Sequence, residues 1–104
     1  MNLLTRPDGT AIRFAVRGTG AVPVLLLAPG GIESAVEKWA GHAYDPWTTL
    51  PGDTFRLIAM DQRNANDHSR GPLGRGWDTY RDDQLALLDH LGMRHCPLVG
   101  SCIG

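Results

Sequence analysis

The sequence predicts an α/β protein built on a mostly parallel central sheet. Two largely apolar runs, residues 22–27 and 55–60, have the length of strands and are bounded by loop-forming residues. Because these runs lack polar–apolar alternation, both should be covered on their two faces, as the strands of a parallel sheet are. An alternating segment before them and a helical repeat after them give the order β-β-β-(loop or helix)-β-α-β.

The N-terminal segment predicts an antiparallel β-hairpin. Residues 12–17 alternate apolar and polar side chains, which is the period of a strand with one buried face. Pro7, Asp8 and Gly9 precede this strand and favour a tight turn.

A helix is predicted from Thr79 to Gly92. Side chains that can form its inner face recur at helical spacing: Tyr80, Gln84, Leu87, Leu88 and Leu91. Asp78 or Thr79 would cap the N-terminus, and Gly92 would end the helix. Asp82 and Asp83 would lie in the first turn, where negative charge complements the helix dipole.

The remaining elements are short. Residues 94–99 predict a strand, and Pro97 should lie near its beginning because proline cannot donate to a central ladder. Residues 33–40 indicate a short helix, and residues 45–47 begin another turn. Without repeats or a linker, the chain is expected to be one domain or part of one.

Composition excludes several classes of function. The net charge is -1 with both signs interspersed, so neither nucleic acid nor a membrane surface is an expected partner. The longest apolar run, residues 22–28, is too short to span a membrane, and the first residues do not resemble a secretory signal. Cys96 and Cys102 are too far apart in sequence and strand geometry for a disulfide, and no ligand spacing predicts a metal site. A soluble, cytoplasmic protein is therefore expected.

Residues 100–104 form a Gly-x-nucleophile-x-Gly pattern directly after the last predicted strand. Glycines on both sides let a strained turn project one reactive side chain. Cys102 is the candidate nucleophile, because placing Ser101 in the middle would put Val99 and Ile103 at the small-residue positions. The alternative is that Cys102 is a small thiol on a non-catalytic turn.

Taken together, these motifs resemble the N-terminal part of an α/β-hydrolase. The resemblance rests on residues 8–10 (Asp-Gly-Thr), 28–31 (Ala-Pro-Gly-Gly) and 61–66 (Asp-Gln-Arg-Asn-Ala-Asn), followed by the helix and the Cys102 turn. It implies that residues 1–104 are the N-terminal part of a single α/β-hydrolase domain.

The resemblance also implies an oxyanion hole, which is a pair of N–H groups that stabilise the charged oxygen of a tetrahedral intermediate. Its donors would be the N–H of Gly30 or Gly31 together with that of Ile103. The family's usual histidine is absent from this loop, and the alternative is that residues 29–31 only turn the chain.

Asp61 and Arg63 are assigned structural roles beside the nucleophile turn. Asn64 and Asn66 replace the family's glycines, and asparagine tolerates a positive φ better than most residues. The serine that usually follows this loop is displaced to Ser69.

The implied activity is acyl transfer on a small-molecule substrate, either by an ester, thioester or amide hydrolase or by an acyltransferase. Cysteine nucleophiles occur in the dienelactone hydrolases and polyester synthases of this fold, so the resemblance allows both. The catalytic acid and histidine would follow Gly104, and no metal or organic cofactor is implied. A non-catalytic protein that binds a ligand or another protein is the alternative.

Aromatic residues offer candidates for an acyl pocket, namely Trp39, Tyr44 and Trp47, although core packing is the commoner use of each. His42 and His68 lie in loops that could face such a pocket, whereas His90 and His95 are expected at the surface.

A second chain or a missing C-terminal part is expected to complete the fold. Without it, the last strand would leave an open sheet edge and a bare sheet face. One hypothesis is that a precursor cleaves itself after Gly104 by an acyl shift, and the other is that the sequence is simply truncated. We favour cleavage.

Overall fold

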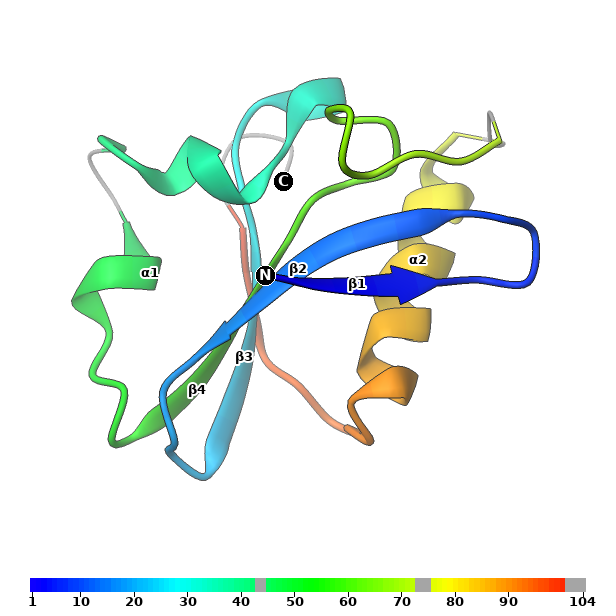
Figure 1. The fold of residues 1–104 in the computed structure, drawn as a ribbon. Coiled ribbons are helices and arrows are strands. Elements are labelled where there is room, and N and C mark those ends of the chain that lie inside the picture. Colours follow the sequence, from blue (N-terminus) through cyan, green and yellow to red (C-terminus); the bar gives the residue numbers. More distant parts are fainter. Residues whose placement is uncertain (43–44, 73–75, 101–104) are drawn as a thin grey trace.

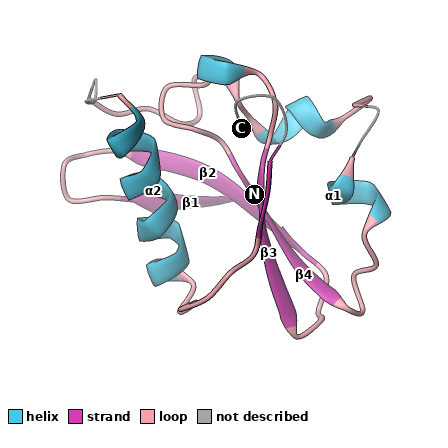
Figure 2. Cartoon of the chain, turned by 180° about the vertical axis from the view of Figure 1, so that it is seen from behind, coloured by secondary structure: helices cyan, strands magenta, loops and turns pink. Residues whose placement is uncertain are grey.

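A computed structural model describes residues 1–42, 45–72 and 76–100. Its five strands form a single mixed sheet in the order β1-β2-β4-β3-β5 (Figures 1 and 2). The strands are β1 (Asn2–Thr5), β2 (Ala11–Arg17), β3 (Val22–Leu27), β4 (Phe55–Met60) and β5 (Leu98–Gly100). The helices are the 3-10 helices η1 (Gly31–Glu33) and η2 (Val36–Trp39), the one-turn helix α1 (Pro46–Thr49) and the long helix α2 (Trp77–His90).

The predicted N-terminal hairpin is confirmed. β1 and β2 are antiparallel, with Thr5 opposite Ala11. Gly9 takes a positive φ of 90° in the turn, and the N–H of Thr10 donates to Asp8 Oδ1 at 2.9 Å. β2 then pairs antiparallel with β4 and joins the hairpin to the central sheet.

β3 and β4 confirm the prediction of buried parallel strands. They run in register from Val22 opposite Phe55 to Leu27 opposite Met60. Alternate side chains of β3 enter two separate cores: Leu25 and Leu27 pack on the side of α2, and Val24 and Leu26 pack on the opposite side. Figure 1 shows the corresponding layers, with α2 on one side of the sheet and α1 on the other.

The predicted α2 is present, but it begins at Trp77, and its predicted N-cap is wrong. Gly76 occupies the N-cap position with φ 64°, and no side chain caps the helix. Asp83 consequently lies in the second turn, where it is fully buried and ion-paired. The helix therefore begins directly after Gly76, whose positive φ lies outside the helical region.

The short helix predicted over residues 33–40 is split into η1 and η2. Ser34 and Ala35 separate them in an extended conformation. The carbonyl of Ser34 accepts a hydrogen bond from the N–H of Gln62 at 2.8 Å, so this peptide bonds to the end of β4 and does not continue a helix. α1 follows the predicted turn, with Asp45 as its N-cap and Pro46 in its first turn.

β5 is shorter than the strand predicted for residues 94–99. It pairs parallel with β3 only from Leu98 to Gly100. Pro97 precedes it, as expected for a residue without an N–H, and its carbonyl accepts from Leu25 N at 2.9 Å. Among the described residues, no helix is long and apolar enough to cross a bilayer.

Candidate active site

The C-terminal ends of β3, β4 and β5 meet at one edge of the sheet. Leu27 of β3 lies opposite Met60 on one side and opposite Gly100 on the other. The loops that follow the three strands therefore start side by side. Ligand sites of parallel α/β sheets lie at such an edge.

Gly30 and Gly31 lie in the loop after β3, at this edge. Both have positive φ, 119° for Gly30 and 58° for Gly31. A Cβ on Gly30 would lie 3.2 Å from the carbonyl oxygen of Glu33, so glycine suits the position by conformation and by space. Their carbonyls accept from Glu33 N and Ser34 N, whereas no hydrogen bond within the described part of the chain uses the N–H of Gly30 or of Gly31. Those two N–H groups are therefore available to an acceptor.

The other two predicted site residues, Cys102 and Ile103, lie outside the described residues. The structure does describe the strand that leads to them. β5 ends at Gly100, which lies opposite Leu27 of β3, and Leu27 is three residues before Gly30 in the sequence.

Ser34 is a residue of this loop that the sequence analysis did not single out. It is buried, and its Oγ donates to the carbonyl of Ala28 at 2.6 Å. Its partner is a main-chain carbonyl six residues earlier, a pairing that no side-chain pattern reveals. The bond closes the loop that contains both glycines.

Asp61 joins the loops after β3 and β4. Its carboxylate is fully buried and accepts from the side chains of Arg13, Asn66 and Ser69, and from the N–H of Val36 at 2.9 Å. Burial by itself would raise the pKa of Asp61, but these hydrogen bonds outweigh it and hold the pKa below the ordinary value. The carboxylate is therefore a charged anchor between the two loops.

Arg63 anchors the same loop to α2. Its guanidinium binds Asp83 through two nitrogens, at 2.9 and 2.8 Å, and donates to the carbonyl of Pro72 at 2.9 Å. The hydrogen bonds to Asp83 raise the pKa of Arg63 further, despite its burial. These contacts agree with the structural roles expected of Asp61 and Arg63.

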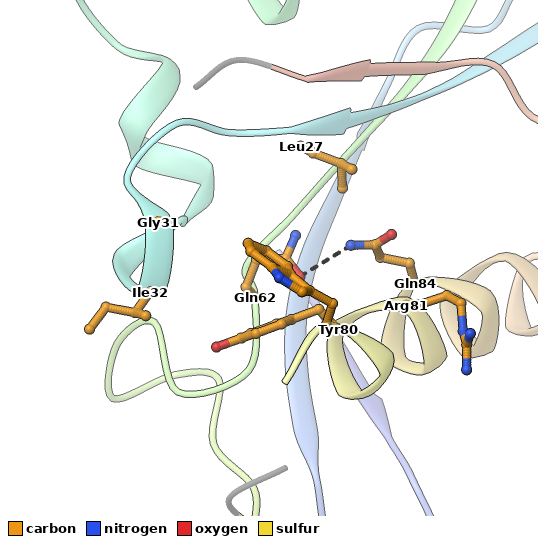
Figure 3. Close-up of a pocket in the computed structure, with 8 residues that line it drawn as sticks. Leu27, Gly31, Ile32, Gln62, Tyr80, Arg81 and Gln84 are labelled. Carbon is orange, nitrogen blue, oxygen red and sulfur yellow. Dashed lines mark hydrogen bonds between the residues drawn. The ribbon is translucent and has the colours of Figure 1, made fainter. Parts of the chain in front are cut away.

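A pocket of about 240 Å³ adjoins the glycine loop. It is lined by Leu27, Gly31 and Ile32, by Gln62 after β4, and by Trp77, Tyr80, Arg81 and Gln84 of α2. Figure 3 shows Gln62 and Gln84 facing one another, with Gln84 Nε2 at 3.5 Å from Gln62 Oε1. Ile32 and Trp77 at its rim are 74% and 69% exposed.

Of the aromatic residues considered for an acyl pocket, Trp39 and Trp47 lie elsewhere. Trp39 is buried in the core on the α1 side, and Trp47 packs against that core. Tyr44 lies outside the described residues. Trp77 and Tyr80 line the pocket instead.

The four histidines do not line this pocket. His68, His90 and His95 are exposed, and His42 packs edge-on against Trp39. Within the described part of the chain, no group of three or more His, Cys, Asp or Glu residues could hold a metal ion.

No protein-family model matches the chain. Three solved structures resemble it over nearly its full length. A hydrolase from Pseudomonas aeruginosa has a TM-score of 0.76 and 25% identity, covering 99% of this chain and 37% of its own. A carboxylesterase from Nitrososphaera gargenis has a TM-score of 0.80 and 23% identity, with coverages of 98% and 36%. An alpha/beta hydrolase from Sphaerobacter thermophilus has a TM-score of 0.72 and 24% identity, with coverages of 95% and 35%.

The chain thus spans little more than a third of the length of each of these hydrolases. The strand order, the parallel pairing of β4, β3 and β5, and these likenesses agree with one another. The chain has the fold of the N-terminal part of an α/β-hydrolase.

Proposed function

We propose that this chain is the N-terminal part of an acyl-transfer enzyme of the α/β-hydrolase fold, with Cys102 as nucleophile. The observation that carries the proposal is the pair of N–H groups at Gly30 and Gly31, which no hydrogen bond among the described residues uses, at the sheet edge where β5 ends. One of them would act with the N–H of Ile103 as the oxyanion hole. Two aligned donors there can lower the barrier by several kcal/mol.

The proposed reaction begins with attack of the Cys102 thiolate on the carbonyl carbon of an ester, thioester or amide. The carbonyl π electrons move to oxygen, and the oxyanion is stabilised by the two N–H groups. Collapse of this intermediate reforms the C=O bond, expels the leaving group with a proton, and leaves an acyl group on sulfur. Water or a second substrate then takes the acyl group, so both hydrolysis and acyl transfer fit the site.

The acid and base of this reaction are proposed to lie in a companion part of the same fold. β5 is the last strand of the sheet and, among the described residues, pairs only with β3. Leu98 is 57% exposed, and it faces the α2 side because its neighbour Val99 packs on the opposite side. An exposed apolar residue on an edge strand is expected to be covered by another part of the protein.

The pocket beside Gly31 lies on the α2 side of the sheet, which is also the side that Leu98 faces. Its rim residues Ile32 and Trp77 are too exposed to enclose a small molecule, because ligand pockets bury most of the ligand surface. We therefore propose that the companion part covers this rim. Self-cleavage after Gly104 remains a hypothesis about how that part arises.

The experiment is a brief pulse of the intact native protein with p-nitrophenyl acetate, followed by intact mass measurement and peptide mapping. One acetyl group on Cys102, absent from the Cys102→Ala variant, is the expected result. Acetylation of another residue would move the nucleophile, and no acetylation at all would favour a binding protein. The same mass spectrum tests cleavage, since a polypeptide that ends at Gly104 is expected if the chain is processed there.

A further inference from the structure

The Ser34 hydroxyl joins the two ends of the glycine loop. Ala28 directly follows β3, and Ser34 directly follows η1. The hydrogen bond from Ser34 Oγ to the Ala28 carbonyl, at 2.6 Å, therefore spans the whole segment that contains Gly30 and Gly31. Both bonded residues are buried, so water does not compete for the bond.

The other hydrogen bonds near Ser34 attach the loop to the residues after β4 or close turns inside the loop. Its carbonyl accepts from Gln62 N, and Val36 N donates to Asp61, so both bonds attach the loop to the end of β4. The N–H of Glu33 donates to the carbonyl of Gly30, and the N–H of Ser34 donates to the carbonyl of Gly31. Both bonds close turns within the loop. Among the described residues, the Ser34 hydroxyl makes the side-chain bond that ties the loop back to β3.

We propose that Ser34 is a positioning residue of the oxyanion hole, an inference that rests on the proposed function. Glycine peptides rotate easily, and donors stabilise an oxyanion only when they are aimed at the developing charge. By holding the Ala28 carbonyl, the hydroxyl limits the rotation of the peptides that carry the N–H groups of Gly30 and Gly31. Ser34 itself does not touch the substrate.

Two reactions of Cys102 in the intact native protein separate this role from a general structural one. With p-nitrophenyl acetate, the thiolate forms an S–C bond to the acetyl carbon and p-nitrophenolate leaves with the electrons of the C–O bond. With iodoacetamide, the thiolate displaces iodide from a CH₂ carbon, and no oxyanion forms. Peptide mapping assigns both products to Cys102, and each rate constant is measured separately.

Ser34→Ala should lower the rate constant of acetylation about tenfold or more. Its rate constant of alkylation should equal that of the wild type, because alkylation does not use the oxyanion hole. Ser34→Thr keeps the hydroxyl and should restore acetylation.

Ser69→Ala is the matched control. Ser69 is equally buried, and its Oγ donates to Asp61 and accepts from Arg13 N, but among the described residues no hydrogen bond joins its side chain to residues 28–34. This variant loses more buried hydrogen bonds than Ser34→Ala, yet both rate constants should stay at the wild-type values.

Equal acetylation rates in wild type and Ser34→Ala would overturn the inference, and so would a parallel fall of acetylation and alkylation. An equal loss of acetylation in Ser69→Ala would also overturn it, because the effect would then be general destabilisation. If wild-type Cys102 is alkylated but never acetylated, the proposed function fails first and this inference fails with it.

Discussion

Arg63 and Asp83 form a two-point ion pair in the interior, with Arg63 Nε at 2.9 Å from Asp83 Oδ2 and Nη2 at 2.8 Å from Oδ1. Arg6 of the hairpin turn also reaches Asp83, at 2.8 Å. Asp8 lies 3.5 Å from Arg63. One buried carboxylate on α2 therefore ties the N-terminal hairpin and the loop after β4 to the same helix.

Asp83→Ala should lower the free energy of unfolding by about 3 kcal/mol or more, because it leaves the Arg63 charge buried without its main partner. Asp82→Ala on the same helix is the control, since Asp82 is exposed and contacts only Arg81 among the described residues. Its cost should stay below about 1 kcal/mol. Urea denaturation of the intact protein measures both, and equal effects would show that the buried ion pair contributes little.

Gly30→Ala should impair both stability and catalysis. Alanine at φ 119° is strained by roughly 1 to 2 kcal/mol, and its Cβ would press on the Glu33 carbonyl. The loop can relieve this only by turning its peptides, which moves the proposed oxyanion donors. Thermal unfolding and acetylation by p-nitrophenyl acetate report the two effects.

Gly9→Ala separates strain from catalysis. Gly9 also has a positive φ, 90°, but a Cβ there meets nothing within 4 Å and the residue lies in the hairpin turn. A comparable loss of stability with normal acetylation is expected. If Gly30→Ala acetylates as fast as Gly9→Ala, Gly30 is not part of the oxyanion loop.

The sequence predicts β3, β4 and the N-terminal hairpin well because their signals are local. β3 and β4 begin and end where the apolar runs do, and the hairpin turn is encoded in consecutive residues. Asn64 takes φ 63°, as expected for asparagine in a glycine position, whereas Asn66 does not have a positive φ. The start of α2 was predicted wrongly, because Asp78 and Thr79 carry the usual capping side chains, whereas the helix begins after Gly76 with no side-chain cap.

The candidate site is predictable only where a motif encodes it. Gly30 and Gly31 became candidates through the family resemblance, in which the oxyanion loop follows a buried strand. Ser34 is missed because its partner is the main-chain carbonyl of Ala28, which leaves no trace in side-chain patterns. Ser69 lies later in the sequence than the family's usual serine, yet its hydroxyl donates to Asp61 at 2.7 Å. This contact could not be predicted because it depends on how the loop folds back on Asp61.

The Asp61 carboxylate should make stability depend on pH in the acid range. Its pKa in the folded protein lies below the ordinary value of 3.8, so its contribution is fully present above that value and is lost as the pH falls through the folded pKa. The wild type should therefore exceed Asp61→Asn in unfolding free energy at pH 6, and the difference should shrink below about pH 4. Urea unfolding at a series of pH values measures it.

Asp67→Asn is the control for this pH series. Asp67 lies in the same loop but is almost fully exposed, with Arg70 at 3.8 Å. The difference between wild type and Asp67→Asn should be small and should not change with pH. A difference for Asp61→Asn that is equally flat would contradict the anchoring role of its charge.

Leu98 and Leu3 test whether a companion part covers the open side of the sheet. They are 57% and 56% exposed, and both lie in the outermost strands, Leu98 in β5 and Leu3 in β1. If the companion part packs on the α2 side beside β5, Leu98→Ala should destabilise the intact native protein by about 2 kcal/mol or more. Leu3→Ala should change the unfolding free energy by no more than about 0.5 kcal/mol, as expected for a surface site. Equal, small effects in chemical denaturation would mean that Leu98 stays at the surface, and the companion part would then have to bind elsewhere.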